Sequence, residues 1–147
     1  MREILFRAKR IDNGEWAEGS YHHQTDYYGE SCDKHYIIDG TETDMEGYGE
    51  HYEIDPETLC QYTGLNDKNG NRIWENDIVS INTYDYMEPQ EDFFGQVVYS
   101  EGWACWCIQP PDEDKAIPLC ECEGSYQTDR FVEGNVFDNS ELLKGEG

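Results

Sequence analysis

The chain is organised around residues 54–81, which read IDPETLCQYTGLNDKNGNRIWENDIVSI. Within this run, Asn69-Gly70 predicts a type I′ β-hairpin turn, because that turn needs positive φ at both central residues and these two residue types tolerate it best. A second polar turn at Glu75-Asn76-Asp77 separates Ile73-Trp74 from a β-branched strand at 78–81. The run therefore predicts paired strands, and it contains no recognisable catalyst.

Patterns in the centre and at both ends of the chain share one resemblance. They are the central runs Gln61–Leu65, Asp67–Gly70 and Asp77–Val79 with Ile73 and Glu75 between them, the opening strand Arg2–Ala8, and the closing segment Glu133–Leu143. Together they resemble the YopX-like family of bacteriophage and prophage proteins. The chain departs from that family's pattern over residues 20–53 and 84–115. The resemblance implies a phage-derived, all-β protein of unassigned function, and it supplies no active-site residues.

Short β-rich runs at hairpin spacing occupy much of the remaining chain, without the alternating helices that a parallel sheet needs. We therefore expect an all-β, mainly antiparallel fold, either a small SH3-like or irregular β-barrel or a twisted sandwich, with long acidic loops. The length of 147 residues predicts a single domain spanning 1–147. Residues 20–53 are polar and predict a loop-rich insertion, broken only by a short strand at Tyr36-Ile37-Ile38.

The composition is strongly acidic, with 33 Asp and Glu against 10 Lys and Arg and a formal net charge of −23. This balance disfavours direct binding to nucleic acid or an anionic membrane, because phosphate contacts draw on Lys and Arg. We expect no signal peptide, because no apolar run long enough for one follows Met1-Arg2-Glu3. No apolar run of about 18 residues occurs either, so we expect the protein in the cytoplasm of a bacterial host. In that reducing compartment the six cysteines are expected as free thiols or metal ligands.

Two cysteine pairs are candidate zinc ligands, Cys105-x-Cys107 and Cys120-x-Cys122. Alternate residues on a strand share a face, so two neighbouring strands could bring four thiolates together. The same alternation also fits four small core side chains, with Glu121 and Glu123 pointing to solvent. We favour the core interpretation and predict no bound metal or other cofactor.

Four histidines and a cysteine lie in the polar region, and only Cys32-x-x-His35 has ligand-like spacing. The set is His22, His23, Cys32, His35 and His51. One such pair is a weak metal signal, and these side chains are expected on the surface. The oxygen-rich run from Asp67 to Asn71 does not match a calcium-binding EF-hand loop, because Arg72 and Ile78 occupy the positions of its glycine and its bidentate glutamate.

A block of eight acids and no Lys or Arg runs from Asp39 to Glu57, while four of the ten basic residues lie at or near the first strand. The first expectation is that these segments complement each other and that the rest is a solvated face. The block is also the candidate protein-binding site, because tyrosines supply contact area and carboxylates steer a basic partner. Its candidate residues are Glu42, Asp44, Glu46, Tyr48, Glu50 and Tyr52.

The composition and motifs favour a non-enzymatic phage accessory protein that binds a host or phage protein. A metalloprotein or enzyme in an unfamiliar β fold is the alternative. A narrower alternative is a nucleic-acid mimic that occupies a basic host protein with surface carboxylates. The sequence is also compatible with a homo-oligomer. No nucleophile elbow, phosphate-binding loop or HExxH motif occurs in the chain.

Overall fold

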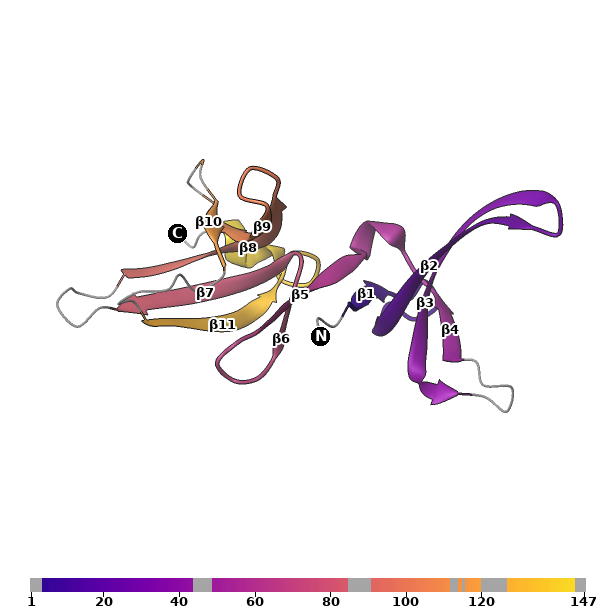
Figure 1. Cartoon of the computed structure of the whole chain (residues 1–147), viewed down its shortest axis with the longest axis horizontal. Coiled ribbons are helices and arrows are strands. Elements are labelled where there is room, and N and C mark those ends of the chain that lie inside the picture. The colour runs from indigo at the N-terminus through magenta and orange to yellow at the C-terminus, as the bar shows by residue number, and fades with distance from the viewer. Residues whose placement is uncertain are drawn as a thin grey trace. The chain divides into compact units, whose positions relative to one another are not determined.

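The computed structural model describes residues 4–43, 49–84, 91–111, 114, 116–119 and 127–144. The chain forms two compact units, Met1–Tyr62 and Thr63–Gly147, where its length alone predicted one domain. Within these described ranges, the regular elements are antiparallel strands and two short 3₁₀ helices (Figure 1). The predicted all-β, mainly antiparallel class is thus confirmed. Among the described residues no helix is long and apolar enough to cross a membrane.

The first unit is built on one antiparallel sheet with the strand order β4-β3-β2-β1-β5. Its elements are β1 (Phe6–Lys9), β2 (Trp16–Tyr27), β3 (Glu30–Thr43), β4 (Gly49–Glu53), the 3₁₀ helix η1 (Pro56–Thr58) and the start of β5 (Cys60–Asn66). The core consists of Ala8, Ala17, Ile37 and Ile54, with Phe6, Tyr21, Tyr52 and Leu59 packed against it.

The prediction of a loop-rich region over residues 20–53 is wrong. Most of it forms the long hairpin of β2 and β3, with β4 paired to the far side of β3. After Gly19 in β2 and before Tyr36 in β3, the described strand pairings join these two strands only to each other. Such a two-stranded ribbon has solvent on both faces, so its residues stay polar and show no buried apolar stripe.

The basic residues of β1 and the bridge after it contact aromatic rings. Arg7 and Lys9 lie over the Trp16 ring, at 4.5 and 5.5 Å from its centroid, and the Arg10 guanidinium lies 4.3 Å from the centroid of Tyr52. Arg10 also forms an ion pair with Asp12, at 2.6 Å. Cation–π contacts and a local carboxylate therefore engage these charges, and Tyr52 links Arg10 to the acidic block.

The second unit contains a five-stranded antiparallel sheet in the order β10-β9-β8-β7-β11. Its elements are the rest of β5, β6 (Arg72–Trp74), β7 (Asp77–Tyr84), β8 (Glu91–Ser100), β9 (Cys105–Gln109), β10 (Ile117–Pro118), β11 (Gln127–Asn135) and the 3₁₀ helix η2 (Ser140–Lys144). Ile73 from the β5–β6 hairpin joins the sheet's core of Val79, Ile81, Val97, Ile108 and Leu119. Val79 and Ile81 occupy alternate positions of β7 and are buried, and Val97 and Ile108 join them from β8 and β9.

One buried carboxylate organises the turn between β5 and β6. Asp67 is 6% exposed. It accepts hydrogen bonds from the backbone N–H groups of Asn69, Asn71 and Val132, at 3.0, 2.8 and 3.1 Å, and from Nδ2 of Asn71 at 3.2 Å. The first two bonds close the turn on itself, while the bond from Val132 ties the turn to β11.

The type I′ assignment at Asn69-Gly70 is wrong. Gly70 has φ +86°, but Asn69 is absent from the three described non-glycine residues with positive φ, which are Tyr28, Asn76 and Ala104. Asp67 causes the difference, because its side chain caps the N–H of Asn69 and its backbone carbonyl accepts from Gly70 N. The left-handed pair at a hairpin turn is instead Tyr28-Gly29, at φ 51° and 82°.

We predict that Gly70→Val lowers the free energy of unfolding by about 1–2 kcal/mol. A Cβ at Gly70 would meet no atom within 4 Å, so the cost arises from the left-handed backbone alone. Gly70→Asn is the matched control and should cost less, because Asn tolerates that conformation. Chemical denaturation of both variants tests this, and a valine variant as stable as wild type would contradict the turn geometry.

The Asp67 carboxylate should also make stability depend on pH. Burial alone would raise its pKa, but the hydrogen bonds from Val132, Asn71 and Asn69 together hold the pKa below the ordinary value of 3.8. A folded pKa below the unfolded one gives stability that is complete above the unfolded value and is lost as pH falls through the folded value.

We therefore expect Asp67→Asn to cost roughly 2–4 kcal/mol of unfolding free energy at neutral pH. The difference from wild type should shrink as the pH falls below about 4. Asp114→Asn, at an exposed acid of the same unit, is the control and should cost little. Denaturation curves measured across that pH range test the prediction, and a pH-independent gap would count against it.

Candidate functional site

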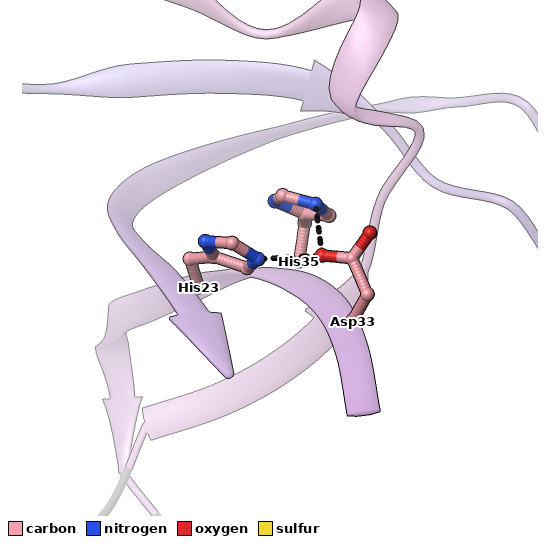
Figure 2. A group of neighbouring side chains, drawn as sticks. All are labelled: His23, Asp33 and His35. Carbon is pink, nitrogen blue, oxygen red and sulfur yellow. Dashed lines mark hydrogen bonds and ion pairs between the residues drawn. The ribbon is translucent and has the colours of Figure 1, made fainter. Parts of the chain in front are cut away.

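A cluster of two imidazoles and a carboxylate lies on one face of the β2–β3 hairpin. His23 on β2 stands directly opposite His35 on β3, and Asp33 lies two residues before His35 on the same face of β3. Figure 2 shows both rings directed at the Asp33 carboxylate. The register of the hairpin shifts between Gln24 and Asp26, next to the cluster, and such β-bulges often re-aim side chains beside a site.

The ligand-type atoms of the cluster all lie within 4.8 Å of one another. His23 Nε2 is 2.6 Å from Asp33 Oδ1, and His35 Nε2 is 3.3 Å from the same oxygen. The two rings stack, with centroids 4.1 Å apart and planes 8° apart. The side chains of His23, Asp33 and His35 are 40%, 79% and 16% exposed, so the cluster is open to solvent on one side and anchored on the other.

Tyr21 fixes the orientation of the His35 ring. The Tyr21 hydroxyl lies 2.6 Å from His35 Nδ1, within hydrogen-bond distance, and leaves Nε2 facing Asp33. The Tyr21 ring is itself held against the core of the first unit and lies 5.8 Å from the Phe6 ring. The packed core therefore determines where one ligand-type nitrogen points.

Asp33 is ionised at neutral pH. The hydrogen bond from His23 is the main cause that holds its pKa below the ordinary value, slight burial opposes it, and the nearby imidazoles add to the lowering. The cluster thus combines a carboxylate anion with two imidazole nitrogens.

The structure assembles part of the histidine set singled out from the sequence and separates the rest. His23 and His35 come together, whereas His22 stands opposite Tyr36 and His51 opposite Ile38. The Cys32 thiol contacts the carbonyl of Gln24 at 3.5 Å, and Cys32 is not among the described residues whose ligand-type atoms cluster with His35. The Cys32-x-x-His35 spacing therefore does not form a site.

Asp33 is the member that the sequence analysis missed. Its signal is the spacing Asp33-x-His35, which places two ligand-type side chains on one face only if the segment is a strand. A loop prediction for residues 20–53 carries no such periodicity and therefore does not indicate Asp33.

The candidate protein-binding residues have different positions. The side chains of Glu42, Asp44, Glu46 and Tyr48 lie outside the described residues. Glu50 on β4 is exposed and pairs in register with Asp39. Tyr52 is half-buried, packs against the core and lies under Arg10, so its ring is part of the fold as well as of the surface.

Two further tyrosines, at the tip of the hairpin, are more exposed than Tyr52. Tyr27 is 58% and Tyr28 is 90% exposed, and their rings meet edge to face with centroids 4.5 Å apart. Residues 24–33 contain three acids, Asp26, Glu30 and Asp33, and no Lys or Arg. The tip is therefore an exposed aromatic pair in an acidic ribbon.

Cys105 and Cys107 lie on β9 with their sulfurs 3.9 Å apart, on one side of the strand. Cys107 is fully buried and Cys105 is half-buried. Cys120 and Cys122 lie outside the described residues, so a four-sulfur group stays a hypothesis. The burial of Cys107 fits a small core side chain.

The second unit has an open hollow of about 720 Å³ beside the turn between β8 and β9. Tyr99 and Trp103, which line it, are 51% and 63% exposed. Among the described lining residues, Asp114 supplies one carboxylate, and none is a histidine or cysteine. The hollow thus lacks a visible pair of converging acid and base groups.

Comparison with known proteins places this architecture in a family. The family model described as YopX protein matches residues 5–144. The chain belongs to the YopX family. A crystal structure of protein EF1440 from Enterococcus faecalis is similar to this YopX-family chain, with a TM-score of 0.50 and 24% identity over 97% of this chain and 99% of that one. At that identity the likeness shows the fold alone. The search of curated proteins found no match.

We predict that Cys60 and Cys107 resist alkylation in the native protein, because their side chains are buried. Cys32 and Cys105 are half-exposed and should react first. Timed labelling followed by peptide mass spectrometry measures the four rates, and labelling in denaturant supplies the reference. Equal rates at Cys105 and Cys107 would contradict the core position of Cys107.

Proposed function

We propose that this YopX-family protein is a phage or prophage accessory protein that acts in the bacterial cytoplasm as a non-enzymatic protein-binding module. The binding surface is the acidic, tyrosine-bearing face of the first unit, and its partner is a basic host or phage protein. The observation that carries the proposal is the Tyr27–Tyr28 pair at the tip of the β2–β3 hairpin.

Exposed tyrosines at a hairpin tip are suited to protein contact. Tyrosine provides a large amphipathic ring with little side-chain entropy to lose on binding. Two rings that already contact each other, 4.5 Å apart, present a partly ordered aromatic surface. Removing such rings from water on binding would supply the apolar part of the affinity.

The backbone at Tyr28 supports a functional role for the ring. Tyr28 has φ 51°, a conformation that costs a bulky L-residue roughly 1–2 kcal/mol and that Asn or Gly adopts more easily. A turn chosen for stability alone would carry Asn-Gly here. The sequence instead places a 90% exposed tyrosine in the strained position.

The charge pattern indicates the kind of partner. The ribbon and β4 carry exposed carboxylates, including Asp26, Glu30 and Glu50. The nearby Arg10 guanidinium forms an ion pair with Asp12 and a cation–π contact with Tyr52. An acidic surface speeds encounter with a basic partner and makes the association rate sensitive to salt.

The hollow of the second unit gives the enzyme alternative little support. The hollow beside Tyr99 and Trp103 has one carboxylate among its described lining residues, whereas general acid–base work needs converging groups. The aromatic tip and the acidic ribbon need no such convergence to bind a protein.

We predict that Tyr28→Asn keeps or raises stability, because Asn suits the left-handed turn, but weakens partner capture about 10-fold. Affinity capture from bacterial lysate at low and high salt provides the assay, and denaturation provides the stability. Trp103→Ser, at an exposed aromatic residue of the second unit, is the control and should leave capture unchanged. Full capture by Tyr28→Asn together with Tyr27→Ser would contradict the proposal.

The acidic block supplies a second arm of the same test. Replacing Glu42, Asp44, Glu46 and Glu50 with Gln or Asn should slow association with the captured partner at low ionic strength and reduce its salt dependence, because rim charges act mainly on the encounter rate. Unchanged association kinetics would remove the block from the interface.

A further inference from the structure

The geometry of the hairpin points to a metal site. We propose that His23, Asp33 and His35 bind one divalent transition-metal ion of the zinc type through His23 Nε2, His35 Nε2 and the Asp33 carboxylate. Two imidazoles and one carboxylate form a donor set that zinc uses in three-ligand sites, where water takes the remaining position.

One separation between donor atoms already matches such an ion, and all three donor atoms lie within 4.8 Å of one another. Bonds of about 2.0–2.1 Å at tetrahedral angles place neighbouring donor atoms roughly 3.3 Å apart. His35 Nε2 and Asp33 Oδ1 are already 3.3 Å apart, and His23 Nε2 lies 2.6 Å from the same oxygen. On binding, the short contact opens and the stacked rings turn so that both Nε2 lone pairs face the ion.

The surroundings of His35 match those of a metal ligand. In protein metal sites the second ring nitrogen of a ligating histidine is held by an outer hydrogen bond, which fixes the tautomer and the ring orientation. Tyr21 supplies this contact at 2.6 Å from Nδ1 of His35. Because the Tyr21 ring packs on the core, the outer contact is rigid while the ligand face stays open to solvent.

The position in the fold gives the ion a structural effect. The cluster lies where the two-stranded ribbon leaves the sheet, and ribbons of two strands are marginally stable alone. An ion bound to one residue of β2 and two of β3 would cross-link the strands at this point. Bound metal should therefore stabilise the hairpin by mass action. This inference does not depend on the proposed protein-binding function.

Zinc titration of the whole chain, made without a metal-affinity tag and freed of metal by a chelator, tests the site. Calorimetry in excess Mg²⁺, which occupies weak carboxylate-only positions, should show one tightly bound equivalent of Zn²⁺. His23→Gln and Asp33→Asn should abolish that equivalent; both side chains are well exposed, so both variants should fold. His22→Gln combined with His51→Gln is the matched control and should bind like wild type.

Two further measurements locate the ion and test Tyr21. Zinc should shift the ring resonances of His23 and His35 in NMR spectra, since it ends their stacking. Tyr21→Phe should keep the stoichiometry and weaken affinity about 10–100-fold; unchanged affinity would overturn the role given to Tyr21. The site itself is overturned if no tight equivalent appears, or if it survives in His23→Gln and Asp33→Asn but is lost in Cys105→Ser with Cys107→Ser.

Discussion

The buried carboxylate of Asp67 constrains the turn between β5 and β6 and its attachment to β11. An anion removed from water needs hydrogen bonds to offset its lost hydration, and Asp67 receives them from Asn69, Asn71 and Val132. These bonds determine the shape of the β5–β6 turn and attach it to β11. The turn between β6 and β7 has a similar arrangement, in which the buried Asp77 carboxylate accepts a hydrogen bond from the backbone N–H of Trp74 at 2.9 Å. Carboxylates at two consecutive turns thus bring Ile73 to the core between them.

The β2–β3 hairpin of the first unit follows a different physical rule. Its ribbon has no buried apolar stripe, so cross-strand side-chain pairs hold it together. One such pair, His23 opposite His35, stacks at 4.1 Å and faces Asp33. At the tip, Tyr28 has a strained left-handed backbone conformation, and the Tyr27–Tyr28 pair is exposed. The ribbon, which is less stable than a packed sheet, thus contains the residues best suited to bind a metal or a protein. Low local stability and backbone strain are typical of functional segments.

Local patterns predicted those parts of the fold in which short-range physics dominates. Alternation correctly indicated that Cys105 and Cys107 share one face of a strand. The same reasoning failed where a side chain competed with the backbone. Asp67 replaced the expected type I′ turn, and the true left-handed pair fell on Tyr28-Gly29, where tyrosine is a poor turn residue. A polar two-stranded ribbon also resembles a loop in composition, which concealed β2 and β3.

Strand alternation, residue counts and motif spacing are properties of the linear chain, so the β class, the acidic charge and the family can be inferred from the residues alone. Which distant groups meet depends on how the strands pair in the folded chain. Strand register places His23 beside Asp33 and His35, and the return of β11 brings Val132 to Asp67, 65 residues away. Register depends on the pairing of whole strands, and a shift of one residue would turn every side chain to the opposite face. No local pattern therefore contains that information.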